Sequence, residues 1–377
     1  MTAAVAVDLG KTGCRAVLWH GDDGPTSDVH EVPGAPGLAA ENGVAAARAA
    51  VRAAVLPLLE RERTPRLAAV CVGAAGAAAA PEAARELAGL LLEDLPADEV
   101  AVASDAVTAH AGALGGRTGV VLAIGTGSVA IGIGDDGSYA RVDGWGPWLG
   151  DEGSGAWIGA AGLRAALRAH DGRGPDTALL SAAVARFGDP DRLPTALGRD
   201  GNPARTAATF APDVARAAAA GDDAASAIIR DAADALGDAV LAAARRIGAA
   251  ATPTGTASAT PSDTPAATPS GTAPDTPPAP LPVTITGGLT GLGEPLLGPL
   301  RSALDDSSRP PHPRHPHPRH PHPRPLHLRP PLGDPLDGAR LLALDASAPH
   351  EPHVARVRRS TPFPTVPTPP VTPPAVA

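Results

Sequence analysis

The sequence has little of several residue types, and each shortage narrows what the protein can do. Two cysteines, Cys14 and Cys71, are too few for a disulfide framework or a four-thiolate metal site, which favours a reducing compartment. Lys11 is the only lysine and the formal net charge is −9, which argues against nucleic acid as a partner because phosphate binding needs clustered Lys and Arg. No uncharged apolar run approaches the roughly 20 residues of a membrane-spanning helix. The sequence therefore predicts a cytoplasmic protein with no nucleic-acid or membrane partner.

Aromatic residues are also scarce, at 2% of the chain, yet three of the four tryptophans lie between residues 144 and 158. This stretch is rich in glycine and holds two adjacent carboxylates, Asp151 and Glu152. Aromatic side chains beside carboxylates indicate a polar small-molecule pocket with an aromatic wall. The alternative is that the two carboxylates stabilise the N-terminus of a helix expected over 153–169 by interacting with its dipole. Trp157, within that helix, is expected to be a core residue.

A short loop separates the first two predicted strands, over residues 3–7 and 14–19. It reads Asp8-Leu9-Gly10-Lys11-Thr12-Gly13, and its glycines allow the backbone N–H groups to form an anion-binding nest. Lys11 and Thr12 would add a charge and a hydroxyl donor to a phosphate. Asp8 would hold Mg²⁺, which takes few carboxylates and keeps several waters. The alternative is an ordinary hairpin turn with a solvated lysine.

A second loop of the same kind favours phosphate binding over the plain turn. Strand 119–124 leads into Gly125-Thr126-Gly127-Ser128, and strand 129–133 follows. Two nests can hold one polyphosphate between them.

Two further polar residues follow predicted structural elements at informative places. Asn42 precedes a helix expected over 43–60, where it is either an N-cap or a ligand for a sugar hydroxyl. Asp105 follows strand 100–103, at the strand end where α/β sheets usually bind ligands. A carboxylate there can accept a proton from a hydroxyl that attacks a phosphoryl group, although capping of the next helix is the alternative.

Strands and helices alternate in the manner of α/β proteins. Three strands come first, which predicts a meander, and later strands add through helical crossovers. Because the strand, loop and strand pattern occurs twice, we expect two lobes built alike, over 1–115 and 116–346. Pro-rich segments 252–282 and 307–331 are expected to be insertions, the first of them disordered, and the tail 347–377 is expected to be disordered as well.

Two other segments carry weaker signals. Gly287 and Gly288 follow a strand expected over 283–286, and such a turn lets a flat ring, adenine or ribose, approach the backbone. The histidines of the His-Pro-Arg repeat over 311–323 could bind metal loosely, but alternate prolines hold the chain extended and oppose convergent ligation.

Taken together, these motifs resemble the N-acetylglucosamine kinase branch of the BadF/BadG/BcrA/BcrD ATPase family, within the sugar kinase, heat-shock protein 70 and actin superfamily. The resemblance covers most of residues 1–345 and depends above all on the stretch 144–154. It implies two ribonuclease H-like α/β lobes with nucleotide and sugar in a cleft between them, and a final helix over 337–346 that packs back on the first lobe.

The resemblance also implies roles for individual residues. The residues implied to bind the phosphates of ATP are Asp8, Gly10, Lys11, Thr12, Gly125, Thr126 and Gly127. Those implied to contact adenosine are Gly221, Gly287 and Gly288. Asp105 is the implied catalytic base, and Asn42, Gly144, Trp145, Gly146 and Asp151 are implied to hold an amino sugar. The first loop departs from the family pattern Asp-Gly-Gly-Gly-Thr-Lys or Arg, because its positive charge lies one residue before the threonine. The two cysteines do not fit the iron–sulfur branch of the family.

The expected activity is therefore phosphorylation of the 6-hydroxyl of N-acetylglucosamine or glucosamine, with ATP and Mg²⁺ as cofactors. A nucleotide-dependent sugar sensor without phosphotransfer and a partner-coupled ATPase are the alternatives. The oligomeric state is open, with a homodimer as one arrangement.

Overall fold

The computed structural model describes residues 3–21, 25–249, 279–305 and 324–360. Contacts divide the chain into two compact units: unit 1 contains residues 1–112 and 334–377, and unit 2 contains residues 113–333. Unit 2 is thus inserted into the sequence of unit 1. The boundary falls close to the predicted one at 115, but the last helix belongs to unit 1.

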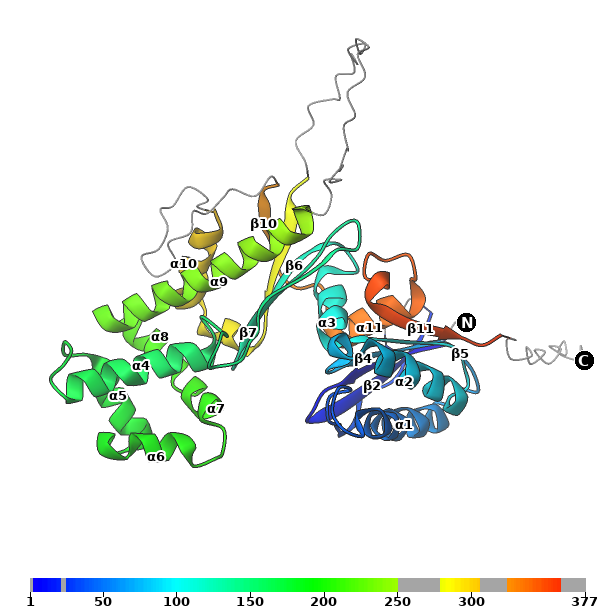
Figure 1. The fold of residues 1–377 in the computed structure, drawn as a ribbon, viewed down its shortest axis with the longest axis horizontal. Helices are drawn as coiled ribbons and strands as arrows, with labels where there is room; N and C mark the ends of the chain where they lie inside the picture. The colour runs from blue at the N-terminus through cyan, green and yellow to red at the C-terminus, as the bar shows by residue number, and fades with distance from the viewer. Residues whose placement is uncertain (1–2, 22–24, 250–278, 306–323, 361–377) are drawn as a thin grey trace, which may run out of the picture. The chain divides into compact units, whose positions relative to one another are not determined.

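Unit 1 is built on a six-stranded sheet (Figure 1). The first three strands form the predicted antiparallel meander, and two later strands add in parallel to the first. The strand order is β11-β5-β4-β1-β2-β3. The strands are β1 (Ala3–Leu9), β2 (Gly13–His20), β3 (His30–Pro33), β4 (Leu67–Ala74), β5 (Ala97–Ser104) and β11 (Val354–Arg358).

Helices cover this sheet because its strands are apolar on both faces. Val5 and Val7 of β1 share a buried core with α1 and α2, whereas Ala4 and Ala6 alternate to the other face. On that other face α11 packs on β1 and β4. Its bounds lie close to those of the helix predicted over 337–346. The helices of unit 1 are α1 (Gly43–Arg61), α2 (Pro81–Asp94), α3 (Asp105–Leu114) and α11 (Pro335–Leu344), with short 3₁₀ turns η1 (Ala77–Ala79) and η4 (Glu351–His353).

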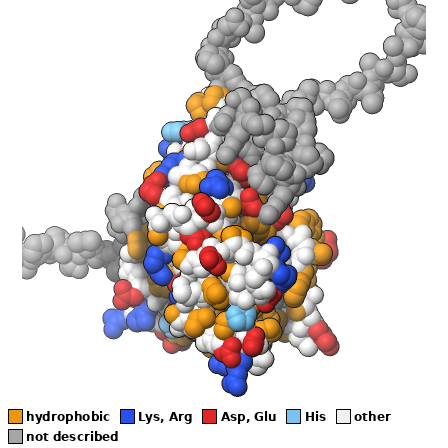
Figure 2. Space-filling model, turned by 90° about the vertical axis from the view of Figure 1, so that its left-hand side faces the viewer, with side chains coloured by type: hydrophobic (Ala, Val, Ile, Leu, Met, Phe, Trp, Pro, Cys, Tyr) orange, Lys and Arg blue, Asp and Glu red, His pale blue; other side chains and the backbone are white. Residues whose placement is uncertain are grey.

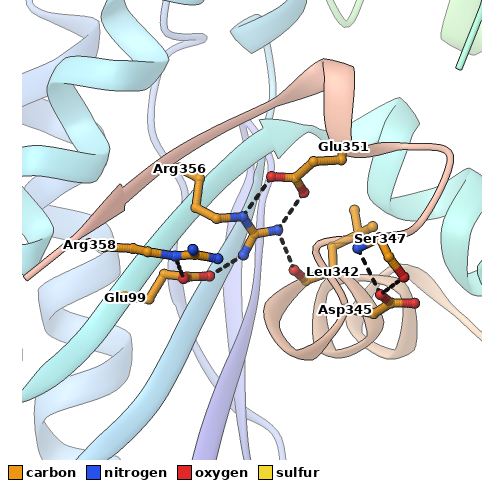
Figure 3. Close-up of polar contacts among 7 residues, drawn as sticks. All are labelled: Glu99, Leu342, Asp345, Ser347, Glu351, Arg356 and Arg358. Atoms are coloured by element: carbon orange, nitrogen blue, oxygen red, sulfur yellow. Dashed lines mark hydrogen bonds and ion pairs between the residues drawn. The ribbon is translucent and has the colours of Figure 1, made fainter.

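The segment 347–360, predicted to be part of a disordered tail, is ordered, and this prediction was wrong. Strand β11 pairs antiparallel with β5 at the edge of the sheet. Arg356 fixes it there: its guanidinium donates to Glu351 at 2.7 and 2.8 Å and to the carbonyl of Leu342 at 2.8 Å, and it forms an ion pair with Glu99 of β5 (Figure 3). Residues 361–377 lie outside the described residues.

Unit 2 repeats the plan of the first sheet. Its strand order, β10-β9-β6-β7-β8, matches β5-β4-β1-β2-β3 position by position, with an antiparallel meander and two parallel additions. The expectation of two units built alike in an α/β fold is confirmed. The strands are β6 (Gly119–Ile124), β7 (Ser128–Ile133), β8 (Tyr139–Asp143), β9 (Leu281–Thr286) and β10 (Leu326–Leu328).

The long helix α9 packs on β6, β7 and β8 and shares one large core with the smaller helices (Figure 1). Strand β10 falls inside the segment 307–331 that was predicted to be an insertion, so that prediction was wrong for its last part; residues 306–323 and 250–278 lie outside the described residues. The helices are α4 (Gly155–His170), α5 (Ala178–Phe187), α6 (Leu193–Gly198), α7 (Pro203–Ala208), α8 (Ala211–Ala219), α9 (Asp223–Ala249) and α10 (Glu294–Asp305), with 3₁₀ turns η2 (Pro190–Arg192) and η3 (Gly288–Leu292).

The surface drawn in Figure 2 carries charges of both signs. Basic and acidic side chains are interspersed there rather than gathered into one patch. Within the described part of the chain, the helices are too short or too polar to cross a membrane.

Candidate active site

One candidate region lies in unit 1, at the edge of the sheet where its parallel strands have their carboxyl ends. Strands β1, β4 and β5 run parallel, and in their register Asp8 is beside Gly73, which is beside Ala103. All three strands end one residue later, so their following loops leave the sheet together. The register therefore places Asp8 and Asp105 at the same sheet edge.

The loop after β1 presents unpaired backbone donors. Gly10 N–H donates to the carbonyl of Gly13 at 2.9 Å and closes the turn. Among the described residues, nothing accepts a hydrogen bond from the N–H groups of Lys11 and Thr12, and both residues are exposed. Two adjacent free N–H groups with a lysine and a hydroxyl make a concave site for an anion.

The segment that follows β3 forms hydrogen bonds to this loop. Gly34 N–H donates to the carbonyl of Thr12 and Ala35 N–H to that of Gly10, both at 3.2 Å. A Cβ on Gly34 would lie 2.3 Å from the Gly10 oxygen, so only glycine fits at this crossing. The loop is therefore held in place before any ligand binds.

Asp8 is partly buried and already ion-paired, with its carboxylate 2.5 Å from the guanidinium of Arg15. No cluster of three or more potential metal ligands occurs in the described part of the chain. One carboxylate is consistent with Mg²⁺, which is usually bound by one or two carboxylates plus substrate phosphates and water. Arg15 would compete for that carboxylate, so a preformed metal site is not present at Asp8.

Asp105 is the first residue of α3. The hydroxyl of Ser104, not the carboxylate of Asp105, accepts from the N–H of Val107 and caps the helix. Asp105 keeps solvent access, but the protein around its carboxylate removes part of its hydration and raises its pKa; the charge of Asp8 acts in the same direction. The N–H of Ala106, at 2.9 Å, and the charge of Lys11 oppose this rise. A carboxylate with a raised pKa at a ligand-binding edge suits a general base.

Asn42 does not cap α1 with its side chain, so the capping interpretation was wrong. Its backbone is left-handed, with φ of 57°, and its exposed side chain makes no capping hydrogen bond. The loop that leads to it crosses the same sheet edge, because Leu38 N–H donates to the carbonyl of Ala75 after β4. Asn42 thus follows a loop at this edge and presents a side-chain amide to solvent.

A second candidate region lies in unit 2, at the loop between β6 and β7. Gly125 N–H donates to the carbonyl of Gly127 at 2.8 Å, while the N–H groups of Thr126 and Gly127 donate to nothing in the described part of the chain. The start of α4 holds this loop, because Gly155 and Ala156 donate to its carbonyls at 2.8 and 3.1 Å. The two loops therefore share their position in the sheet and their pair of free donors.

The tryptophan-rich stretch is organised by a residue that the sequence analysis did not select, Asp143. One of its carboxylate oxygens accepts from Asp151 N–H and the other from Glu152 N–H, both at 2.8 Å. The backbone of Asp143 is left-handed, as are those of Gly144, Gly146 and Asp151. A carboxylate at the end of a strand, directly before the first glycine of the stretch, was the available signal.

This arrangement brings Asp151 against the second loop. A Cβ on Gly127 would lie 2.7 Å from a carboxylate oxygen of Asp151, so the side chain of Asp151 lies directly against this loop. Gly146 N–H donates to the same carboxylate at 3.3 Å. Asp151 is therefore not a helix cap, a role that Ser154 fills by accepting from Trp157 N–H.

The tryptophans differ in their surroundings. Trp145 is 65% exposed and lies under the guanidinium of Arg141, 5.0 Å from the ring centre. Trp148 is 89% exposed, whereas Trp157 is half-buried against the core, as expected, and also lines a cavity. The aromatic wall predicted from the sequence is thus present on unit 2.

The three glycines expected near adenosine are only partly brought together. Gly287 directly follows β9 and packs so closely on Ile124, the residue before the second loop, that a Cβ would lie 2.2 Å from the Ile124 carbonyl oxygen. It lines a cavity of about 570 Å³, and Gly288 begins η3 beside it. Gly221 lies in the exposed turn between α8 and α9 and does not line that cavity.

Comparison with known proteins yields a family and several relatives. A model of the BadF/BadG/BcrA/BcrD ATPase family matches residues 5–257. The N-acetylmuramic acid/N-acetylglucosamine kinase of Clostridium acetobutylicum is 33% identical over 116 residues, which are 29% of this chain and 36% of that protein. The N-acetyl-D-glucosamine kinase of Dictyostelium discoideum is 30% identical over 149 residues, 38% of this chain and 47% of that protein. The chain therefore aligns with less than half the length of either relative.

Among solved structures, a Chromobacterium violaceum protein assigned as an N-acetylglucosamine kinase has a TM-score of 0.57 and 27% identity. The match covers 91% of this chain and 99% of that chain. The similarity therefore extends over both units of the fold.

Proposed function

The chain belongs to the BadF/BadG/BcrA/BcrD ATPase family, and on that premise we propose that it is an ATP-dependent kinase for an amino sugar. The names of the two relatives and of the solved structure support this class of substrate. The acceptor that we propose is the 6-hydroxyl of N-acetylglucosamine or glucosamine.

One observation carries the proposal: Asp105 lies at the same sheet edge as a loop with two unpaired N–H donors. Phosphoryl transfer needs little covalent chemistry from the protein, because positioning and charge stabilisation supply most of the rate. The nest at Lys11 and Thr12 binds phosphate oxygens, and Asp105 accepts the proton of the attacking hydroxyl. The second nest, at Thr126 and Gly127, binds phosphate in the same way.

Mg²⁺ would supply charge neutralisation of the polyphosphate when it is bound with ATP. Asp8 is the residue that would hold it, through water, while Arg15 remains within reach of the same carboxylate. Adenosine is proposed to contact Gly287 and Gly288, with Gly221 as a more distant contributor.

The residues of unit 2 that we propose as sugar ligands are Gly144, Trp145, Gly146 and Asp151, and the candidate in unit 1, taken by itself, is Asn42. An exposed indole offers a flat apolar face to a sugar ring, and a carboxylate or amide accepts or donates to its hydroxyls. The supporting observations are the exposed amide of Asn42 and the exposed ring of Trp145.

We also propose a cytoplasmic location. Both cysteines are free and buried, and burial raises the pKa of each thiol to about 12, with the charge of Asp8 acting in the same direction on Cys14. Free cysteines that form no disulfide are usual in a reducing compartment.

A coupled ADP-release assay over a panel of amino sugars tests the proposal. Sugar-dependent turnover with a phosphorylated product is the expected result. Binding of sugar without turnover would instead indicate a sensor, and sugar-independent hydrolysis would indicate a partner-coupled ATPase.

Asp151→Asn is expected to weaken sugar binding while it leaves nucleotide binding unchanged. Asparagine tolerates the left-handed backbone of this position, so the substitution removes a charge without changing the loop. Hydrogen bonds to charged groups contribute about 1.5–3 kcal/mol, so the Kd for sugar should rise on the order of 10-fold or more. Isothermal titration with sugar and, separately, with ATP measures both; Asp176→Asn, at an exposed aspartate of unit 2 outside the cavity that Asp151 lines, is the matched control. An unchanged Kd for sugar in the Asp151 variant would remove this residue from the sugar site.

A further inference from the structure

Asp143, the last residue of β8, has a left-handed backbone with φ of 62°. Four residues other than glycine share this conformation in the described part of the chain: Asn42, Arg63, Asp143 and Asp151. Arg63 follows the end of α1, where a left-handed residue is a common helix ending, and Asn42 and Asp151 are proposed sugar ligands. Such a backbone costs free energy and is frequent at functional sites. Asp143 is the member of this group that the proposed function leaves without a role.

The carboxylate of Asp143 fastens the far end of the loop that follows β8. Its two oxygens accept from the N–H groups of Asp151 and Glu152, both at 2.8 Å. Bonds from a backbone N–H to a carboxylate are roughly twice as strong as those between neutral groups. A Cβ on Gly150 would lie 2.1 Å from one of these oxygens and 3.0 Å from the Cβ of Trp145, so the carboxylate packs directly on the loop backbone. The loop 144–152 therefore returns to the strand from which it started.

Between its two ends the loop is a tight turn with an exposed tip. The N–H of Gly150 donates to the carbonyl of Gly146 at 2.9 Å, and the N–H of Leu149 donates to the same carbonyl at 3.3 Å. Trp148 and Leu149, at the tip, are exposed although both are large and apolar, and neither belongs to the core of unit 2. Because the tip adds no core packing, the polar contacts at the base of the loop hold it in place.

The position of the Asp151 carboxylate depends on this base. Asp143 holds the N–H of Asp151, whose side chain lies against Gly127 and accepts from the N–H of Gly146 at 3.3 Å. The phosphate loop 125–128 has a separate support, because the first N–H groups of α4 donate to its carbonyls. Loss of the Asp143 carboxylate should therefore affect Asp151 more than the phosphate loop.

We propose that Asp143 is a positioning residue for sugar binding: it fixes the backbone of Asp151, so that the Asp151 carboxylate is in place before the sugar arrives. Asp143 acts through Asp151 and makes no contact with the sugar itself. A loop that is already ordered loses less conformational freedom on binding, which strengthens the binding. The inference rests on the proposed function for the role of Asp151, and it adds the residue on which the affinity of that site depends.

Asp143→Asn is expected to raise the Kd for N-acetylglucosamine about 10-fold, as for the loss of one charge-assisted hydrogen bond. Asparagine tolerates the left-handed backbone and keeps one acceptor oxygen, but its NH₂ group faces the second backbone N–H. Asp143→Gly keeps the backbone and offers no acceptor, so it should weaken sugar binding further. Isothermal titration of the full chain measures both variants, and the Kd for ATP should be little changed.

Two further variants separate positioning from a general loss of structure. Asp136→Asn is the matched control, because Asp136 is an exposed carboxylate in the turn at the other end of β8 and accepts from the N–H of Ser138 at 2.9 Å. It should leave the Kd for sugar unchanged. The double variant Asp143→Asn with Asp151→Asn should bind sugar no more weakly than Asp151→Asn alone, because both substitutions remove the same interaction. General loosening of unit 2 would instead multiply the two fold-changes.

Hydrogen exchange of backbone amides, followed by NMR, tests the positioning without any sugar. The amide protons of Asp151 and Glu152 should exchange faster in Asp143→Asn than in the wild-type chain, because their acceptor is weakened. Those of Gly155 and Ala156, which donate to the phosphate loop, should exchange as slowly as before.

The outcomes distinguish this inference from the proposed function. Unchanged exchange at Asp151 and Glu152 in Asp143→Asn, multiplied fold-changes in the double variant, or an equal loss of ATP and sugar would each overturn the positioning role and leave the kinase proposal standing. Absence of sugar binding by the wild-type chain, together with faster exchange at these two amides in Asp143→Asn, would refute the proposed function and keep the positioning of Asp151 by Asp143.

Discussion

Replacement of Asp105 by asparagine is expected to lower kcat about 10²–10⁴-fold, the usual contribution of a general base. Asparagine keeps the size of the side chain but cannot accept a proton, so the loss should appear in kcat, with the KM for ATP little changed. The coupled ADP-release assay at saturating sugar measures it. Glu86→Gln, an exposed carboxylate of α2 in the same unit, is the control for a general effect of lost charge.

The pH dependence of the wild-type rate provides a second measurement on Asp105. The base must be ionised, and its pKa is raised by loss of hydration and by the charge of Asp8. Activity should therefore fall as the pH decreases through this raised pKa, at a higher pH than the ordinary value of about 3.9 for aspartate. Near wild-type turnover in Asp105→Asn would remove the residue from the catalytic role.

Arg356→Met is expected to destabilise unit 1 by about 3–5 kcal/mol, the cost of breaking a buried ion pair by removal of one partner. The side chain of Arg356 is only 8% exposed, and that of Glu99 is 14% exposed. Burial alone would lower the pKa of the guanidinium, but its hydrogen bonds to Glu351 and Glu99 raise it, so the residue stays charged. Without it, the Glu99 carboxylate would keep only Arg358, while the backbone pairing of β11 with β5 would remain (Figure 3).

Urea unfolding followed by circular dichroism measures this loss. Arg358→Met is the matched control: Arg358 pairs with the same glutamate but is 66% exposed, and exposed pairs contribute about 0–1 kcal/mol. The double variant Arg356→Met with Glu99→Gln should recover part of the stability, because it removes the charge left behind. Equal effects of the two arginine substitutions would show that the buried cluster does not hold the strand.

The sequence predicted the parts of the fold that depend on local pattern. Short apolar runs bounded by glycines gave the meander of each sheet, and the repeat of strand, loop and strand gave the likeness of the two units. Strand β11 was missed because it is only five residues long and lies within a Pro-rich context, and its pairing with β5 joins residues about 250 positions apart. Such a strand is defined by its partner, not by its own sequence.

For the candidate site, too, the sequence identified the local motifs but not the residues that hold these motifs in place. Glycine loops and strand-end carboxylates indicated Thr12, Thr126 and Asp105. Two such contacts were missed: the hydrogen bond that Gly34 donates to the first loop, and the one that Asp143 accepts from Asp151 N–H in the tryptophan-rich stretch. Both involve backbone groups, which no sequence motif encodes. Asn42 shows the converse, because its position before a helix predicted a cap, whereas its backbone is left-handed and its side chain makes no capping hydrogen bond.

Because the chain leaves unit 1 at residue 112 and returns at residue 334, unit 1 cannot be completed until all of unit 2 has been synthesised. Strand β5 emerges from the ribosome roughly 250 residues before β11, a delay of about 12–50 s at about 5–20 residues per second. During that interval β5 has an open edge, where strands are prone to pair with other chains. Glu99 lies on that edge and has not yet met Arg356, so its unneutralised charge opposes such pairing until the last strand arrives.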